Sequence, residues 1–170
     1  GAIKNILTPK TPKYANEILN VGKNLAEKGS KLRDTAINTA KEFGKKVDGT
    51  KIVKAVEEWG KRAKNANPTQ KSAIQKILSA AKNTYKGKQL KVDTAKNLWD
   101  DADAGYTAAG RTANTIEGGY HGAVRGILRK ELDRVAPGFE KGTGLIREGL
   151  KKEKLLKPIR DSLSRADIKE

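Results

Sequence analysis

The stretch that decides the fold runs from Thr94 to Val135 and reads TAKNLWDDADAGYTAAGRTANTIEGGYHGAVRGILRKELDRV. Small and apolar residues recur along it mostly at intervals of three or four, which is the spacing of one helical face. The members of that face are Ala95, Leu98, Ala102, Tyr106, Ala109, Ala113, Ile116, Tyr120, Ala123, Ile127, Leu132 and Val135. No proline occurs before Pro137-Gly138. The pattern therefore predicts one long Ala/Gly-rich helix over residues 92–136.

Glycines interrupt the second half of this stretch. Gly118, Gly122 and Gly126 recur every four residues, so a continuous helix would carry them on one flat face. Each glycine inside a helix costs about 1 kcal/mol of helix propensity. Close approach of another helix would offset that cost, and the three glycines would then be helix-packing residues. The alternative is a break in the helix near Gly118-Gly119, and the sequence leaves both interpretations open.

Further periodic segments predict helices on both sides of this stretch. Residues 1–13 contain two prolines and are interpreted as an extended basic arm. An apolar stripe then predicts helices over about 14–28 and 30–46, with Ser30 as the cap of the second. The members of the stripe are Tyr14, Ile18, Val21, Leu25, Leu32, Ala36, Ala40, Phe43 and Val47.

Local start and stop signals place the remaining helices. Asp48-Gly49-Thr50 predicts a turn followed by a helix start, and Asn67-Pro68-Thr69-Gln70 combines an N-cap, a first-position proline and a capping-box glutamine. The latter helix should end near Gly87, and a last basic segment should break at Pro158. The sequence thus predicts an all-α fold: an extended bundle of about six helices, without strands. Its regions are an arm over 1–13, a lysine-rich helical region over 14–91, the long helix over 92–136 and a basic tail over 137–170.

Positive charge is concentrated in the first half of the chain. The whole chain has a net charge of +16, and residues 1–91 hold 21 lysines and arginines against 7 acidic residues. Only Arg33 and Arg62 in that half are arginines. Lysine acts as a point charge on phosphates, whereas base reading favours the fork of arginine. The composition therefore predicts contact with nucleic-acid phosphates without sequence preference. The candidate residues are Lys41, Lys45, Lys46, Lys51, Lys54, Lys61, Arg62 and Lys64.

Catalytic and metal chemistry finds little support in the sequence. The chain has no cysteine, and its one histidine, His121, lies among glycine and tyrosine without a partner motif. The acidic cluster Asp100, Asp101 and Asp103 does not match a calcium loop, because neither the sixth nor the twelfth position carries the required residue. Trp59 falls on an apolar stripe and is interpreted as a core residue. We therefore expect a non-enzymatic protein with no catalytic residue, metal or cofactor.

Three C-terminal segments resemble a known group of proteins. Residues 98–103 read LWDDAD, residues 122–133 read GAVRGILRKELD and precede Ala136-Pro137-Gly138-Phe139, and residues 159–166 read IRDSLSRA. Over residues 95–166 they are similar to helical segments in internal and ejection proteins of tailed bacteriophages. In those proteins, an asparagine and a tyrosine often lie between the helices that correspond to residues 122–133 and 159–166. Both are missing from residues 140–157 of this chain.

The resemblance implies a structural virion protein inside the particle, against packaged DNA or the portal and tail assembly. Its partners would be nucleic acid, other virion proteins and further copies of itself, with contact to a membrane after ejection. The chain begins at Gly1 rather than at methionine, which would fit the proteolytic maturation common in such particles. Two alternatives stay open: a DNA-compacting protein of the nucleoid type in the bacterial cytoplasm, and a helical module that binds an acidic protein.

Overall fold

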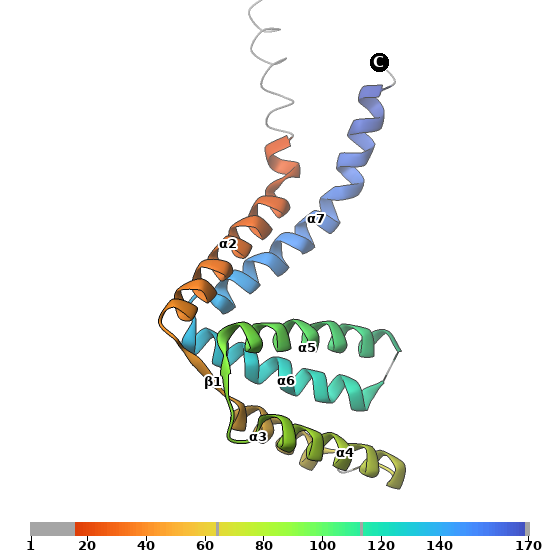
Figure 1. Cartoon of the computed structure of the whole chain (residues 1–170). Coiled ribbons are helices and arrows are strands. Elements are labelled where there is room, and N and C mark those ends of the chain that lie inside the picture. The colour runs from red at the N-terminus through yellow and green to blue at the C-terminus, as the bar shows by residue number, and fades with distance from the viewer. Residues whose placement is uncertain (1–15, 64, 113, 169–170) are drawn as a thin grey trace, which may run out of the picture. The chain divides into compact units, whose positions relative to one another are not determined.

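The computed structural model describes residues 16–63, 65–112 and 114–168 (Figure 1). Apart from one two-stranded ladder, the regular secondary structure of these residues is helical, which confirms the predicted all-α class. The predicted arm over 1–13 lies outside the described residues. The elements, in chain order, are α2 (Val21–Glu42), β1 (Lys46–Asp48), α3 (Gly49–Arg62), α4 (Pro68–Tyr85), β2 (Gln89–Lys91), α5 (Val92–Thr112), α6 (Thr115–Val135) and α7 (Phe139–Ile168).

The chain folds into two compact units that differ from the predicted regions. Residues 35–140 form the central unit, and the described residues of 1–34 and 141–170 form the terminal unit. The predicted boundaries at 91/92 and 136/137 both fall inside the central unit. They separate elements and not packing units, because α5 begins at Val92 and α6 ends at Val135.

Two helix–strand–helix segments organise the central unit. The glycine before each strand has a positive φ, +63° at Gly44 and +72° at Gly87, a conformation that glycine adopts without strain. The two glycines are 43 positions apart, and the same offset relates the buried Val47 to Leu90 in the second segment. β1 and β2 pair antiparallel, with Val47 opposite Leu90. The sequence analysis found neither this repeat nor these strands, because each strand has only three residues and forms through a distant partner.

Caps and turn contacts fix the ends of α3 and α4. The Asp48 carboxylate accepts a hydrogen bond from the Thr50 backbone N–H at 2.9 Å. The capping box predicted at Asn67 and Gln70 is confirmed, with reciprocal hydrogen bonds of 2.8 and 2.9 Å. The Thr50 hydroxyl also accepts from the backbone N–H of Gly87 at 2.9 Å, which ties the two turns together.

The long helix predicted over 92–136 is wrong: the structure forms two helices there, α5 and α6. α5 ends at Thr112, and the Asn114 side chain caps α6 by accepting from the Glu117 backbone N–H at 3.1 Å. The two helices lie side by side as a hairpin (Figure 1). The alternative interpretation placed a break near Gly118-Gly119. The observed break lies a few residues earlier, between Thr112 and Thr115. An asparagine followed three residues later by glutamate is an N-terminal cap signal, and the regular stripe concealed it.

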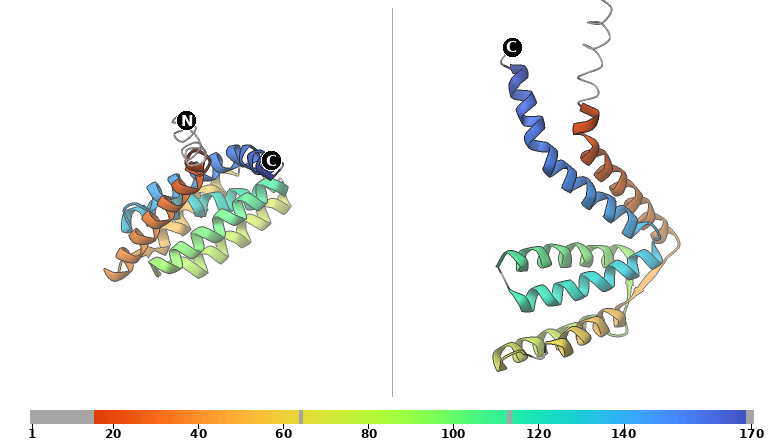
Figure 2. Two further views of the ribbon diagram at one scale, coloured as in Figure 1. Left: turned by 90° about the horizontal axis from the view of Figure 1, so that it is seen from above. Right: turned by 180° about the vertical axis from the view of Figure 1, so that it is seen from behind.

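The core of the central unit lies between the ladder, α3, α5 and α6. α6 lies between α5 and the α3–α4 pair (Figures 1 and 2). The end of α2 and the start of α7 add Ala40 and Phe139, and Phe139 meets Trp99 edge to face at a ring distance of 5.3 Å. The largest fully buried side chains are Phe139, Ile52, Leu128, Leu132, Val47, Val56 and Val92.

Backbone contact holds the terminal unit together. α2 and α7 lie side by side, and a Cβ atom at Gly22 would be 2.5 Å from the carbonyl oxygen of Gly149. Seven residues further along α2, the backbones of Gly29 and Gly142 approach equally closely, since a Cβ at Gly142 would be 2.6 Å from the Gly29 carbonyl oxygen. Only glycine fits at such distances. The heptad spacing of both glycine pairs is what lets the two helix backbones touch.

These contacts correct three sequence expectations. α2 runs without a break through Gly29 and Ser30, so the predicted restart there is wrong. The predicted stripe is correct only in part, because Ala36, Ala40 and Val47 are buried, whereas Ile18 is 61% exposed and Phe43 is 75% exposed. The buried positions of this stretch are Leu19, Gly22 and Gly29 in the terminal unit, and Ala36, Ile37 and Ala40 in the central unit. α7 likewise continues through Pro158, where a break was expected.

Candidate polyanion-binding surface

The net positive charge of the central unit is concentrated in one layer. Residues 45–91, which form β1, α3, α4 and β2, contain 13 lysines and arginines and 3 acidic residues. Residues 92–135, which form α5 and α6, contain 6 basic and 7 acidic residues. Because α3 packs its apolar face on α6, Lys54, Lys61 and Arg62 lie exposed on the outer face of α3. The result is a basic layer on a nearly neutral hairpin.

The three acidic residues of this layer are all engaged locally. Asp48 caps α3, Glu57 lies 3.6 Å from Lys82, and Glu58 lies 3.6 Å from Arg62. Within the described ranges, Lys51 pairs with Glu131 of α6 at 2.9 Å, and the other basic side chains of the layer have no acidic group within salt-bridge distance. They are Lys45, Lys46, Lys54, Lys61, Lys71, Lys76, Lys86, Lys88 and Lys91, which we call the unpaired lysines. Their charge is available to an external anion.

The predicted candidates fall into several groups. Lys45 and Lys46 lie at the ladder, and Lys54 and Lys61 lie exposed on α3. Arg62 and Lys41 are exposed but paired, Arg62 with Glu58 and Lys41 with Asp93 at 3.0 Å. Lys64 lies outside the described residues. The sequence analysis missed Lys86, Lys88 and Lys91, although their spacing around Gly87 is a visible charge run.

Lys51 has an internal role that revises its interpretation as a polyanion-binding residue. Its Nζ atom lies 2.9 Å from the carboxylate of Glu131, and Arg134 donates to the same carboxylate at 2.8 and 3.1 Å. Glu131 is only 6% exposed. Burial alone would raise the pKa of Glu131, but the hydrogen bonds from Arg134 and Lys51 outweigh burial and hold the pKa below its ordinary value. Lys51 therefore ties α3 to α6.

A shallow depression lies beside the ladder. It measures about 320 Å³ and is lined by Lys41, Gly44, Lys45, Lys46, Lys91, Val92 and Asp93. Lys46 and Lys91 stand directly opposite each other in the register of the two strands. Four lysines and one aspartate thus line one small volume, which we call the ladder depression.

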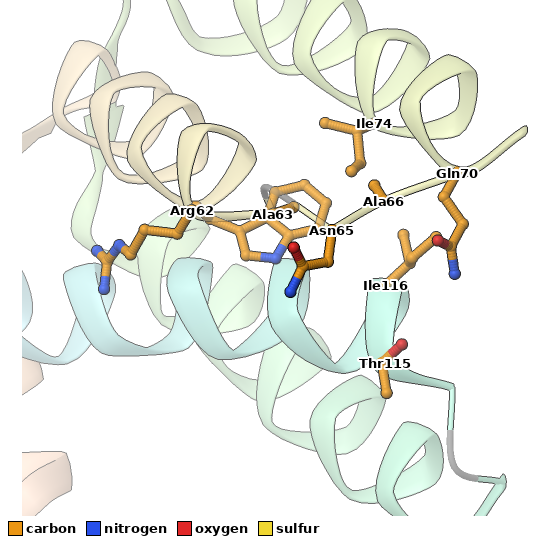
Figure 3. A pocket seen from close by; sticks show the side chains of 9 residues that line it. Arg62, Ala63, Asn65, Ala66, Gln70, Ile74, Thr115 and Ile116 are labelled. Atoms are coloured by element: carbon orange, nitrogen blue, oxygen red, sulfur yellow. The ribbon is translucent and has the colours of Figure 1, made fainter. Parts of the chain in front are cut away.

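A second pocket lies where the α3–α4 connection meets the start of α6 (Figure 3). It measures about 340 Å³, and its polar lining includes Arg62, Asn65 and Gln70. The Trp59 ring lies 6.1 Å from the Tyr120 ring. Trp59 also contacts the backbone of Gly119 so closely that a Cβ there would overlap the indole. Trp59 packs against the core as predicted, and burial raises the pKa of Tyr120 beside it.

The predicted glycine strip on α6 makes no close helix contact. A Cβ at Gly118 would be 3.5 Å from Ala109, and one at Gly122 would be 3.4 Å from the Tyr106 ring, both ordinary contact distances. A Cβ at Gly126 would meet nothing within 4 Å, so no helix in the described part of this chain packs closely there, and packing by a neighbouring copy stays a prediction. The strip faces α5 side chains rather than a helix backbone.

His121 packs against α5. A Cβ at Gly105 would be 2.6 Å from the His121 imidazole, and the imidazole lies 5.1 Å from the Tyr120 ring. Within the described residues, no cluster of three or more histidine or acidic side chains has the geometry to hold a metal ion. No helix of that part of the chain is long and apolar enough to cross a membrane.

Comparison of the chain with known protein families, with curated proteins and with solved structures finds no match. The resemblance to bacteriophage internal and ejection proteins therefore stays a prediction, carried by the residues quoted for it. Function has to be inferred from the charge and geometry of the surface itself.

Proposed function

We propose that this protein is a non-enzymatic structural protein that binds nucleic acid through the phosphate backbone without reading its sequence. The observation that carries the proposal is the set of unpaired lysines on the layer formed by β1, α3, α4 and β2. A surface with this excess of one charge releases counterions from nucleic acid when it binds, which supplies affinity that does not depend on sequence.

The chemistry of the layer also supports the absence of sequence reading. All nine unpaired side chains are lysines, and the arginine of the layer, Arg62, lies beside Glu58. Lysine lacks the planar fork that pairs with a guanine edge. Helices α3 and α4 present their lysines on exposed outer faces, where the flexible side chains can follow a phosphate backbone.

The biological setting is a separate part of the proposal. The resemblance over residues 95–166 supports a place inside a bacteriophage particle, in contact with packaged DNA and with other virion proteins, including further copies of this chain. Detection of the protein by mass spectrometry in purified particles, in a fixed copy number per particle, would support that setting. Its presence only in the nucleoid fraction of the host would favour the DNA-compacting alternative.

Binding is tested by mobility shift with two duplexes of unrelated sequence and equal length. We expect equal affinities for both, and we expect the triple variant Lys54→Gln/Lys61→Gln/Lys76→Gln to bind both at least about tenfold more weakly. The matched control is Lys130→Gln/Lys141→Gln/Lys151→Gln, which removes the same charge from exposed lysines outside the layer. Equal losses in the two variants would mean that net charge alone, and not this layer, binds the duplex.

A further inference from the structure

We propose that the ladder depression seats one backbone phosphate of the bound nucleic acid. This inference rests on the proposed function and names the point on the basic layer where the backbone is held. The depression differs from the rest of the layer because strand pairing sets two of its lysines, Lys46 and Lys91, directly opposite each other, whereas the lysines of α3 and α4 project separately from helix surfaces.

The strand register forces two like charges together. Lys46 and Lys91 are directly opposite in the ladder, a position where like charges destabilise an antiparallel pair. A shift of one residue would relieve the repulsion, but it would also turn the fully buried Val47 out of the core. The repulsion is therefore built into the fold, and an anion between the two ammonium groups would remove it.

The surroundings of this pair suit a tetrahedral oxyanion. Gly44 leaves the neighbouring space open, because a Cβ there would meet nothing within 4 Å. Lys45 adds a third ammonium group without an acidic partner in the described part of the chain, while Lys41 is held by Asp93 at the edge of the depression. The volume of about 320 Å³ is roughly ten times the share of one water molecule in the liquid, about 30 Å³. A phosphate group fits with its remaining water.

The test uses the full chain and two readouts. The ladder variant is Lys46→Gln/Lys91→Gln, and the control is Lys54→Gln/Lys61→Gln, which removes the same charge from exposed positions on α3. The first readout is the melting temperature with and without millimolar inorganic pyrophosphate, since a ligand that binds the folded state raises that temperature. The second readout is affinity for a duplex at low salt.

The proposal expects pyrophosphate to raise the melting temperature of the wild type and the control, and to leave that of the ladder variant unchanged. It also expects the ladder variant to lose at least about tenfold in duplex affinity, and more than the control loses. An equal pyrophosphate shift in all three proteins would overturn the phosphate site, whatever the duplex result. If pyrophosphate fails to raise the melting temperature only in the ladder variant, and the wild type binds no duplex, the phosphate site stands. Nucleic acid would then be rejected as the ligand that supplies the phosphate.

Discussion

The glycines that α2 and α7 share and the four-residue glycine strip of α6 have different roles. In the terminal unit, Gly22 and Gly29 of α2 contact the backbone of Gly149 and Gly142 of α7. The two helix backbones touch there because none of these residues has a side chain. In the strip of the central unit, by contrast, Gly126 faces open space, and the core there combines branched, aromatic and alanine side chains. The comparison shows that the spacing of glycines on one helix does not identify a packing face. A matching glycine on a second helix is also required.

The largest expected effect breaks the terminal unit. Gly29→Leu would place a side chain where the backbone of Gly142 now lies, and we expect a loss of about 3 kcal/mol or more in the stability of α2–α7 packing. Amide hydrogen exchange over residues 21–34 measures that loss. The matched control is Gly126→Leu, which should leave exchange in both units close to that of the wild type. Similar behaviour of the two variants would contradict the distinction between the units.

The next largest effect is expected at the buried carboxylate of Glu131 in the central unit. Glu131→Gln would weaken the hydrogen bonds from Lys51 and Arg134, and we expect a loss of about 2 kcal/mol at neutral pH. Since the folded pKa of Glu131 is below its ordinary value of 4.5, the carboxylate contributes its full stability above pH 4.5. That contribution is lost as the pH falls through the folded pKa. Urea unfolding at neutral and acidic pH should therefore show the difference between wild type and variant shrinking in acid.

A smaller effect is expected at the break between α5 and α6. Asn114→Ala removes the cap of α6 and should cost about 1 kcal/mol in urea unfolding. The reference is Asn67→Ala, which removes the equivalent cap of α4 and should cost a similar amount. A negligible loss at Asn114 alone would show that the α5–α6 hairpin is held by packing and not by its cap.

The smallest expected effect is an increase in stability. Gly126→Ala adds a methyl group in open space and removes the propensity cost of glycine, so we expect a stabilisation of about 1 kcal/mol. Gly29→Ala makes the same chemical change at the α2–α7 contact, where the methyl group would overlap the backbone of Gly142 and Ile146, and should destabilise. Opposite signs in the thermal shifts of these two variants would sharpen the comparison, and equal signs would contradict it.

Local features of the fold could be predicted from the sequence, whereas features that depend on distant partners could not. The capping box at Asn67 and Gln70 is contained in four consecutive residues, and the structure has it as predicted. The ladder pairs three-residue strands that are 43 positions apart, so no local sequence pattern predicts it. The contact between Gly22 and Gly149 likewise joins the two ends of the chain. The one sequence signal for this contact was the seven-residue spacing of glycines, which occurs both at Gly22 and Gly29 and at Gly142 and Gly149.

The same division holds for the candidate surface. The excess of lysine over residues 45–91 was visible in the composition, and it identified Lys46 and Lys54 as candidates. Lys91 was missed because only the strand register places it opposite Lys46. Lys51 was assigned to the surface because its partner Glu131 lies 80 residues further along the chain. Charge counts locate a basic layer, but the fold decides which of its charges remain unpaired.

The central claim is that the basic layer of β1, α3, α4 and β2 binds the phosphate backbone, and the salt dependence of duplex binding tests it most directly. Log K should fall linearly with log salt concentration, at equal slopes for unrelated sequences. The slope of Lys54→Gln/Lys61→Gln/Lys76→Gln should be smaller than that of the wild type by about 3, since each phosphate contact contributes about 1. A wild-type affinity independent of salt, or a slope unchanged by the triple substitution, would contradict the claim.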